Sequence, residues 1–473
     1  MNLKIKNDQE LINDIKKNGN NHLFRFWDKM TSEERKLLLD DLHQVDFNLI
    51  SAYYEKFHLS KKKQIDFEKP ETVLIDDKKR KDFRIKGEEI LKKGEVAFIT
   101  VAGGQASRLG YDAPKGFFPV TPVTQKSLFE HFANTLLFLA GHYKVNLKWY
   151  IMTSISNDRD TREYFEKNGY FGLTQSNVVF LTQNMLPTIS FEGKMILSKE
   201  KRLMTNPDGH GGSLKALYET GLLKDMESTG IKYLYYFQVD NPLIDLNDTG
   251  FLGYHVSNKN DVSTKVIRKK NPWEKLGLIA KLDNGKNAII EYSDLPEEKA
   301  GEKDDDGNYR HMMGSIGCHI FSIDFLLHST KKLPVHFAIK SIEAYNPGNT
   351  DPVTIEFEAI KFETFVFDIL LFAKTSGFYE CLRREEFSPL KNRTGNDSIE
   401  TCRNDQIGRY VTWLKDAGFI NKDMKTDGIT IEISPSYAPD KNIFLEKATK
   451  DSDNLKKTIF NENGNLKNEI YIG

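Results

Sequence analysis

Two glycines, an arginine and a lysine form the most informative cluster in this sequence of 473 residues. Gly103 and Gly104 end an apolar, β-branched run, and Arg108 and Lys115 follow them in the next segment. Glycine lets the backbone approach a ligand closely because it has no Cβ, and successive N–H groups in such a loop can cradle phosphate. Arg108 and Lys115 would place two positive charges beside a polyphosphate. The segment therefore predicts a site for a nucleoside triphosphate.

The two most common glycine-rich phosphate motifs do not fit this segment. A Walker P-loop continues as Gly-Lys-Ser/Thr, whereas Gly110 is followed by Tyr111. The dinucleotide fingerprint needs three glycines in a fixed pattern, and Gly103, Gly104 and Gly110 do not match it. The loop therefore indicates a nucleotide site of another class.

Three further segments carry residues that could bind a ligand or take part in catalysis, and each segment also has an ordinary structural explanation. Asp240 ends an apolar run, where a carboxylate can hold Mg²⁺ against phosphates or simply cap a loop. Residues 206–212 place several glycines and His210 ahead of an expected helix, which suits a ligand loop or a turn. Lys391 follows a proline turn and, taken alone, is a solvated surface lysine.

The elements that would position these residues alternate along the chain. Short apolar runs predict strands at 96–102, 147–153, 178–181, 233–239 and 262–266, and helical spacing predicts helices at 128–141 and 213–224. Such alternation favours an α/β fold with a mainly parallel sheet. These sheets bind ligands beyond the carboxyl ends of their strands, and the loop from Gly103 begins at such an end.

The chain is long enough for several domains, and three are predicted. Residues 1–88 show helical spacing, with a capping box formed by Thr31 and Glu34. Residues 89–385 form the α/β domain that carries the predicted nucleotide site. Residues 386–473 form a small α+β domain, with a helix at 406–417 and short β segments at 429–434 and 459–472.

Composition restricts the classes of partner. Sixty-seven basic residues balance 68 acidic ones, for a net charge of −1, so no nucleic-acid partner is expected. The three cysteines are few and widely scattered, which suits a reducing cytoplasm. The first residues lack the apolar core of a signal peptide, and no run reaches the length of a membrane span. We expect a cytoplasmic protein without a membrane partner.

Taken together, the segments resemble the eukaryotic-type UDP-N-acetylglucosamine (UDP-N-acetylhexosamine) pyrophosphorylases. The wider family includes UDP-glucose and UDP-sugar pyrophosphorylases. The segments that match in order are residues 22–27, 102–110, 114–116, 183–187, 191–194, 207–212, 239–241, Gly277, 290–293, 361–368 and 386–392. The resemblance implies a Rossmann-like sheet of the GT-A nucleotidyltransferase type.

The resemblance also implies a role for each matching residue. The nucleotide would lie against Ala102, Gly103, Gly104, Lys115, Gln183 and Gly209. Arg108, Lys115 and Lys391 would act in catalysis by binding phosphate oxygens, and Asp240 would hold Mg²⁺, with Mn²⁺ as a substitute. The sugar would lie against His210, Gly277, Glu291, Ser315, Phe365 and Phe367, although a buried element would also contain the two phenylalanines.

The implied activity is that of a nucleotidyltransferase, a UTP:sugar-1-phosphate uridylyltransferase. UTP and N-acetylglucosamine 1-phosphate would give the UDP-sugar and pyrophosphate, by in-line attack on the α-phosphorus in a monomer or weak homo-oligomer. Three departures from the family pattern are Ala106-Ser107 in place of Gly-Thr, and His210 and Ser315 where Asn is usual. His210 leaves a UDP-glucose or broad UDP-sugar pyrophosphorylase as the alternative, and a catalytically silent nucleotide-sugar sensor is the alternative of another class.

Overall fold

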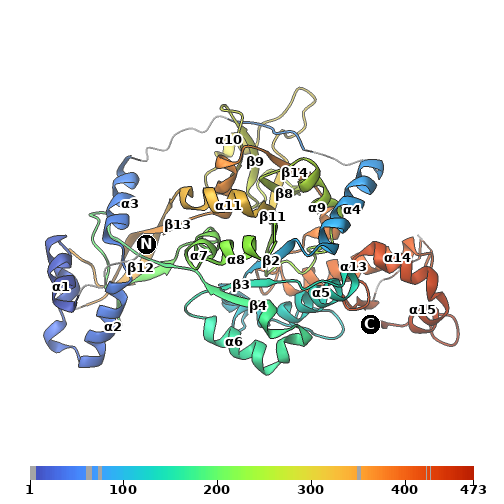
Figure 1. The fold of residues 1–473 in the computed structure, drawn as a ribbon, viewed down its shortest axis with the longest axis horizontal. Coiled ribbons are helices and arrows are strands. Elements are labelled where there is room, and N and C mark those ends of the chain that lie inside the picture. The colour runs from blue at the N-terminus through green and yellow to red at the C-terminus, as the bar shows by residue number, and fades with distance from the viewer. Residues whose placement is uncertain are drawn as a thin grey trace. The chain divides into compact units, whose positions relative to one another are not determined.

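The computed structural model describes residues 7–59, 67–72, 77–348, 353–421, 423–424, 426 and 428–473 (Figure 1). Contacts group the chain into two compact units, each assembled from separate stretches of sequence. Unit 1 comprises Met1–Asp66, Gln183–Thr220 and Thr330–Ile369, and unit 2 comprises Phe67–Thr182, Gly221–Ser329 and Leu370–Gly473. The division into three domains at residues 88 and 385 stays a prediction.

The centre of unit 2 is a run of parallel strands. β2 (Val96–Val101) lies between β3 (Trp149–Thr153) and β7 (Tyr233–Gln238) and is parallel to both, and β4 (Val178–Thr182) continues the parallel run beside β3. All of β3 and most of β2 are buried, as expected for strands that helices cover on both faces. The predicted strands and the mainly parallel α/β sheet are confirmed.

Antiparallel strands extend this sheet on the β7 side. β11 (Met313–Ser322) pairs with β7 and with β8 (Val262–Arg268), which confirms the strand predicted at 262–266. β14 (Ser376–Glu380) runs parallel to β8. The remaining strands of this sheet are β9 (Leu278–Leu282), β10 (Asn287–Ile290) and β1 (Phe67–Glu68).

Aromatic side chains fill the core between the sheet and its helices in unit 2. Phe98 of β2 and Phe237 of β7 join Phe129 of α5 (Leu128–Tyr143) and Phe251 of α9 (Thr249–Ser257) in one buried cluster. The prediction of a helix at 128–141 is therefore confirmed. The other helices of this part are α4 (Asp77–Lys92), α6 (Asp158–Lys167), α8 (Leu222–Ser228), α10 (Glu297–Ala300), α11 (Ile323–Ser329) and α12 (Arg383–Glu386).

The C-terminal part of unit 2 has its own apolar cluster. It contains α13 (Ile399–Asp416), α14 (Lys441–Lys450), α15 (Ser452–Ile459) and the parallel strands β15 (Thr430–Ile433) and β16 (Glu469–Ile472). The helix predicted at 406–417 is present but begins earlier, at a capping box on Ser398. The β segment predicted at 459–472 is only partly correct, because Ile459 ends a helix and pairing begins at Glu469.

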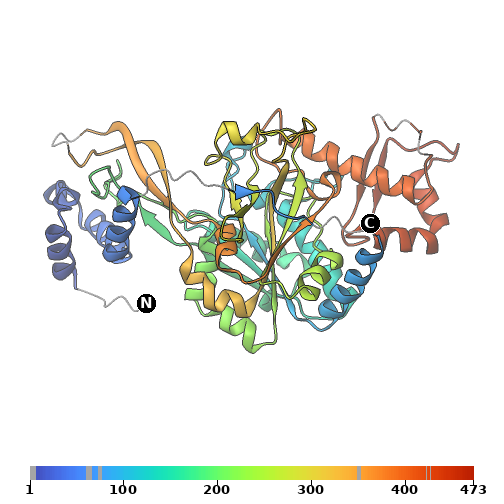
Figure 2. The same cartoon turned by 90° about the horizontal axis from the view of Figure 1, so that it is seen from above.

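Unit 1 combines N-terminal helices with short antiparallel strand pairs. α1 (Asp8–Lys17), α2 (Ser32–His43) and α3 (Phe47–Leu59) share a buried apolar cluster with residues of β5 (Met185–Pro187) and β13 (Ile355–Glu363) (Figures 1 and 2). The capping box of Thr31 and Glu34 is confirmed at the start of α2. β13 pairs with β12 (His336–Ala344), and β5 pairs with β6 (Thr205–Pro207).

The helix predicted at 213–224 is interrupted. α7 (Gly212–Glu219) ends just before Gly221, which has a φ of +83°. Only glycine adopts this backbone conformation readily, so Gly221 separates α7 from α8. None of the helices in the described part of the chain has the length and apolar character needed to cross a bilayer.

Candidate active site

The loop that follows β2 starts at the same edge of the sheet as the predicted metal ligand. The Ala102 N–H donates to the Met152 carbonyl at 2.8 Å, and the Val239 N–H donates to the Val101 carbonyl at 3.2 Å. The carboxyl ends of three parallel strands therefore lie side by side. Asp240 follows Val239 directly, so the sheet places its carboxylate beside the glycine loop, as expected for ligand sites in such folds.

Backbone hydrogen bonds fold the glycine loop back on itself. The Lys115 N–H donates to the Gly104 carbonyl at 3.1 Å, and the Ala106 N–H donates to the Ala113 carbonyl at 3.0 Å. Gly110 has a φ of +72°, the left-handed conformation that the turn between these two contacts requires. This fold of the loop places Lys115 close to the carboxyl end of β2.

Lys115 reaches the predicted metal ligand directly. Its Nζ lies 3.2 Å from the Oδ2 of Asp240, and both side chains are largely buried. Burial alone would raise the pKa of the Asp240 carboxyl, but Lys115 and Lys391 outweigh it and hold that pKa below its ordinary value. Two lysines far apart in the sequence therefore act on one carboxylate, which stays ionised at neutral pH.

The segment that carries Lys391 is attached to the Asp240 loop. The Leu390 N–H donates to the Asp240 carbonyl at 2.7 Å, and the Lys391 N–H donates to the Asp397 carbonyl at 2.8 Å. Lys391 is half-buried and close enough to Asp240 to lower its pKa. The structure therefore brings Lys115, Asp240 and Lys391 together. The sequence around Lys391, taken alone, did not predict this.

Two arginines lie at the exposed side of the same loop. Arg108 is in the short 3₁₀ turn Ser107–Leu109, and its side chain is exposed. Arg393, which sequence analysis did not select, is also exposed, and its side chain lies 3.5 Å from the position that a Cβ on Gly110 would take. Its place two residues after Lys391 was the only sequence signal for it. Both arginines add positive charge to the loop.

The donor set fits a magnesium ion held mainly by substrate. Asp240 is one carboxylate, and among the residues that the structure describes there is no group of three or more His, Cys, Asp or Glu side chains arranged to hold a metal. Mg²⁺ is commonly held by one or two carboxylates together with substrate phosphates and water. Asp240 can supply that single carboxylate.

Three of the predicted sugar residues of unit 2 lie together. The Ser315 N–H donates to the Gly277 carbonyl at 2.9 Å. A Cβ on Gly277 would lie 2.7 Å from the Cγ2 of Ile289 and 3.8 Å from the Oε2 of Glu291. Gly277 is therefore the residue that lets β9 and β10 approach closely here, and the Ser315 hydroxyl is used locally, accepting from the Gly317 N–H at 3.2 Å.

The second glycine loop is built into unit 1 through Thr364. The Thr364 N–H and hydroxyl both donate to the Asp208 carbonyl, at 2.7 and 2.8 Å, and the Gly211 N–H donates to the Thr364 carbonyl at 2.8 Å. Gly209 has a φ of +84°, and a Cβ there would lie 2.5 Å from the Thr364 carbonyl oxygen. The close approach of these backbones explains Gly209 and Gly211, and a Cβ on Gly212 would collide with the Asp208 carboxylate.

His210 lies among the two predicted phenylalanines. Its ring stacks on Phe365 with 5.4 Å between ring centroids and lies 5.6 Å from Phe367. Its Nδ1 accepts a hydrogen bond from the Val366 N–H at 3.1 Å, so the proton is assigned to Nε2. Burial, with a smaller effect from His336, lowers the pKa of His210 to about 4. His210 is thus a neutral side chain with one fixed donor.

Asp208 is a buried acid of unit 1 that sequence analysis did not select. It is 2% exposed, and its Oδ1 has no hydrogen-bond partner among the described residues. Burial raises the pKa of this carboxyl to about 7, although Lys215 opposes the rise. Gln183, predicted to contact uracil, is also buried in unit 1, directly after β4. A carboxyl beside several glycines was the only sequence signal for Asp208.

The family model for UTP–glucose-1-phosphate uridylyltransferase matches residues 47–397, most of the chain. The chain belongs to this family. The UDP-N-acetylglucosamine pyrophosphorylase of Saccharomyces cerevisiae is 35% identical over 452 residues, 89% of this chain and 93% of that protein. The UDP-N-acetylglucosamine diphosphorylase 2 of Arabidopsis thaliana is 31% identical over 459 residues, 91% of this chain and 90% of that protein.

A solved structure agrees with this family assignment at the level of the fold. The crystal structure of the uridine diphosphate N-acetylglucosamine pyrophosphorylase from Trypanosoma brucei matches with a TM-score of 0.81 and 24% sequence identity. The match covers 100% of this chain and 99% of that one. The fold and the family predicted from the sequence are therefore confirmed.

Proposed function

We propose that this member of the family transfers uridylyl groups, making UDP-N-acetylglucosamine and pyrophosphate from UTP and N-acetylglucosamine 1-phosphate. The observation that carries the proposal is the cluster of Lys115, Asp240 and Lys391 at the carboxyl ends of β2 and β7. A cluster of cations around one carboxylate suits a triphosphate with a bound metal. The names of the relatives from S. cerevisiae and A. thaliana support the choice of sugar.

The reaction requires positioning and charge neutralisation. A phosphate oxygen of the sugar 1-phosphate attacks the α-phosphorus of UTP, and the bond to the leaving pyrophosphate breaks on the opposite side. The attacking oxygen is already ionised at neutral pH, so no protein base is needed. Lys115, Lys391 and Arg108 bind phosphate oxygens and stabilise the charge that develops on them, which is the main form of catalysis in phosphoryl transfer.

Asp240 is the residue that would hold the magnesium ion. Bound Mg²⁺ would neutralise charge on substrate phosphates, and Mn²⁺, which also takes oxygen ligands, is expected to replace it. Lys115 keeps Asp240 ionised and is itself within hydrogen-bonding distance of it. The same carboxylate contacts Lys115 and would hold the metal ion, so both positive charges would lie near the polyphosphate.

Two sets of residues are proposed to bind the rest of the substrates. Backbone and side-chain atoms of Ala102, Gly103, Gly104, Lys115, Gln183 and Gly209 bind the nucleotide. His210, Gly277, Glu291, Ser315, Phe365 and Phe367 are proposed to contact the sugar, and His210 would donate a hydrogen bond to it through Nε2.

One observation favours a broader sugar range. Asn offers both a donor and an acceptor, whereas His210 has its acceptor occupied by the Val366 N–H and retains a single donor. A pocket with fewer matched hydrogen bonds discriminates less between sugars. The second candidate is therefore a UDP-glucose or broad UDP-sugar pyrophosphorylase.

A panel of sugar 1-phosphates tests both candidates. Pyrophosphate release is measured with UTP and Mg²⁺ for N-acetylglucosamine, N-acetylgalactosamine and glucose 1-phosphates, and kcat/KM is compared. We expect N-acetylglucosamine 1-phosphate to be preferred, and the double variant His210→Asn, Ser315→Asn to increase that preference. Use of glucose 1-phosphate alone would instead assign the UDP-glucose activity, and no release with any sugar would favour a nucleotide-sugar sensor.

We also propose a cytoplasmic location and a monomer or weak homo-oligomer. Cys318, Cys381 and Cys402 are free thiols, and Cys318 and Cys402 are buried. Free thiols persist where glutathione keeps the compartment reducing. Fractionation of the cells that make the protein and its elution volume on a sizing column test these two statements.

A further inference from the structure

Asn241 follows the predicted metal ligand directly, and its side chain points away from the phosphate site into the protein. It is 3% exposed. Its Nδ2 donates to the Glu386 carbonyl at 2.7 Å, and its Oδ1 accepts from the Ser388 N–H at 3.0 Å. One amide therefore spans two backbone groups of the segment that ends at Lys391.

Asp240, the residue before Asn241, adds a backbone contact to these two side-chain contacts. The Leu390 N–H donates to the Asp240 carbonyl at 2.7 Å. The Asp240–Asn241 corner is thus bound at three points along residues 386–390. Lys391 follows immediately, and its charge lowers the pKa of the Asp240 carboxyl.

A buried ion pair supports the segment from the other side. Lys265 of β8 is fully buried, with its Nζ 2.7 Å from the Oε1 of Glu386 and 2.9 Å from the Oδ2 of Asp248. The Oε2 of Glu386 accepts from the Asp245 N–H at 3.0 Å. Burial would lower the pKa of Lys265, but the two carboxylates outweigh it and raise that pKa well above its ordinary value. The central sheet therefore holds Glu386 by a charged contact.

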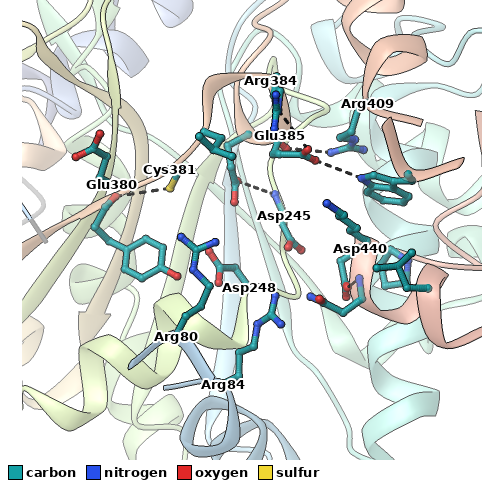
Figure 3. Close-up of a pocket in the computed structure, with 18 residues that line it drawn as sticks. Arg80, Arg84, Asp245, Asp248, Glu380, Cys381, Arg384, Glu385, Arg409 and Asp440 are labelled. Carbon is teal, nitrogen blue, oxygen red and sulfur yellow. Dashed lines mark hydrogen bonds and ion pairs between the residues drawn. The ribbon is translucent and has the colours of Figure 1, made fainter. Parts of the chain in front are cut away.

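A pocket of about 450 Å³ adjoins this ion pair. Asp245, Asp248 and Asp440 lie on its walls together with Arg80 and Arg84 (Figure 3). A polar pocket of this size admits water, which can solvate charged groups on its walls. Asn241, in contrast, is buried, and among the residues that the structure describes its side-chain amide has two hydrogen-bond partners, the Glu386 carbonyl and the Ser388 N–H.

We propose that Asn241, supported by the Lys265–Glu386 ion pair, is a positioning residue that holds Lys391 beside Asp240. The inference rests on the proposed roles of Lys391 and Asp240 at the phosphates. Asn241 touches neither substrate nor the reacting atoms. It acts by fixing the place of a cation, and a displacement of about 1 Å in such a group can cost about 10²-fold in rate.

A double-mutant cycle on kcat tests this inference in the full chain. The variants are Asn241→Ala, Lys391→Met and both together, assayed by pyrophosphate release from UTP and N-acetylglucosamine 1-phosphate. We expect Asn241→Ala to lower kcat by about 10- to 100-fold. In the Lys391→Met background the same change should cost less than about threefold, because the cation that Asn241 positions is already absent.

Asn247 provides a matched control on the same loop. It is also a buried amide, but it accepts from the Tyr143 hydroxyl and donates to Asp440, away from Lys391. Asn247→Ala should lower the thermal unfolding midpoint about as much as Asn241→Ala does, with kcat changed by less than about threefold in either background. If Asn241→Ala does not yield folded protein, Asn241→Ser takes its place.

The outcomes separate this inference from the proposed function. An inactive wild-type chain would overturn the proposed function and this inference with it. A fully active Lys391→Met would overturn the role of Lys391 and the route through which Asn241 is inferred to act. Lys391→Met could be slow while Asn241→Ala lowers kcat by the same factor in the Lys391→Met background as in the wild type. In that case Asn241 has a purely structural role and only this inference fails.

Discussion

Removal of the Lys391 charge should lower kcat strongly while leaving the free energy of unfolding almost unchanged. The backbone of Lys391 is held by its N–H bond to Asp397, which any side chain leaves intact. The side chain is half-buried, and its positive charge lowers the pKa of the Asp240 carboxyl. Lys391→Met should therefore change the free energy of unfolding by only about 0.5 kcal/mol. Loss of a group that stabilises transition-state charge typically costs about 10²- to 10³-fold in kcat, or about 3–4 kcal/mol.

The same substitution should also move the pH profile. Lys115 and Lys391 together hold the pKa of Asp240 below its ordinary value, against the effect of burial. With Lys391 removed, the pKa of Asp240 rises, so protonation begins at a higher pH. The acid limb of the kcat/KM profile should therefore shift to higher pH in Lys391→Met, and Lys391→Arg, which keeps the charge, should shift it less.

The assay is pyrophosphate release with UTP, N-acetylglucosamine 1-phosphate and Mg²⁺, with kcat and KM determined separately and thermal unfolding measured on the same samples. Lys224→Met is the control, because Lys224 is exposed on α8 of the same unit. Lys391→Met with kcat within about threefold of the wild type would refute the assignment, since a phosphate cation is worth far more. A large fall in the unfolding midpoint would show that Lys391 is mainly structural.

Three further changes test other parts of the site. Asp240→Asn should abolish most activity and raise the Mg²⁺ concentration needed for half-maximal rate, since an amide lacks the charge that holds the ion; overlapping Mg²⁺ titrations would place the metal elsewhere. Burial raises the pKa of Asp208 from 3.8 to about 7 in the folded protein, so the protonated carboxyl stabilises the fold. This contribution is complete below the unfolded pKa of 3.8 and is lost as the pH rises through 7. Asp208→Asn should therefore gain stability relative to the wild type between pH 4 and 8, by up to about 4 kcal/mol, as followed by thermal unfolding. A pH-independent difference between Asp208→Asn and the wild type would contradict the raised pKa. Gly209→Ala should lower kcat/KM at least about tenfold, because its Cβ would lie 2.5 Å from the Thr364 carbonyl oxygen at a φ of +84°; unchanged kinetics would show that the loop does not need this conformation.

Local sequence was sufficient for the elements that carry the nucleotide loop. The β-branched run of β2 and the glycines after it predict a buried strand and a close-approach loop, and both are present. Local patterns were less reliable where one residue decides the outcome. Gly221 breaks the helix predicted at 213–224, because its left-handed backbone conformation cannot continue a helix. The residues of 459–472 have strand-like composition, yet Ile459 is the last residue of α15, where it packs in the C-terminal apolar cluster.

The roles predicted for Asp240 and Lys391 depended on the family resemblance, since neither segment is informative alone. Asp240 has the ordinary sequence context of a residue after a strand, and Lys391 that of a surface lysine. In the structure, one carboxylate has its pKa lowered by two cations that come from separate parts of the sequence. Parallel strand order brings β2 and β7 together, and hydrogen bonds from residues 386–390 bring Lys391 to them.

Most of the strand and helix pattern, the glycine loop and the family follow from the sequence alone, because these depend on local conformational preference and on motifs in a fixed order. Tertiary structure alone decided which charges face one another. The pKa of Asp240 is lowered by Lys115, whose Nζ lies 3.2 Å from its Oδ2, and by Lys391, and the Coulomb energy of such charges depends on their separation. The bonds of Asn241 to residues 386–388 decide that geometry, and nothing in the local sequence around residue 241 shows it.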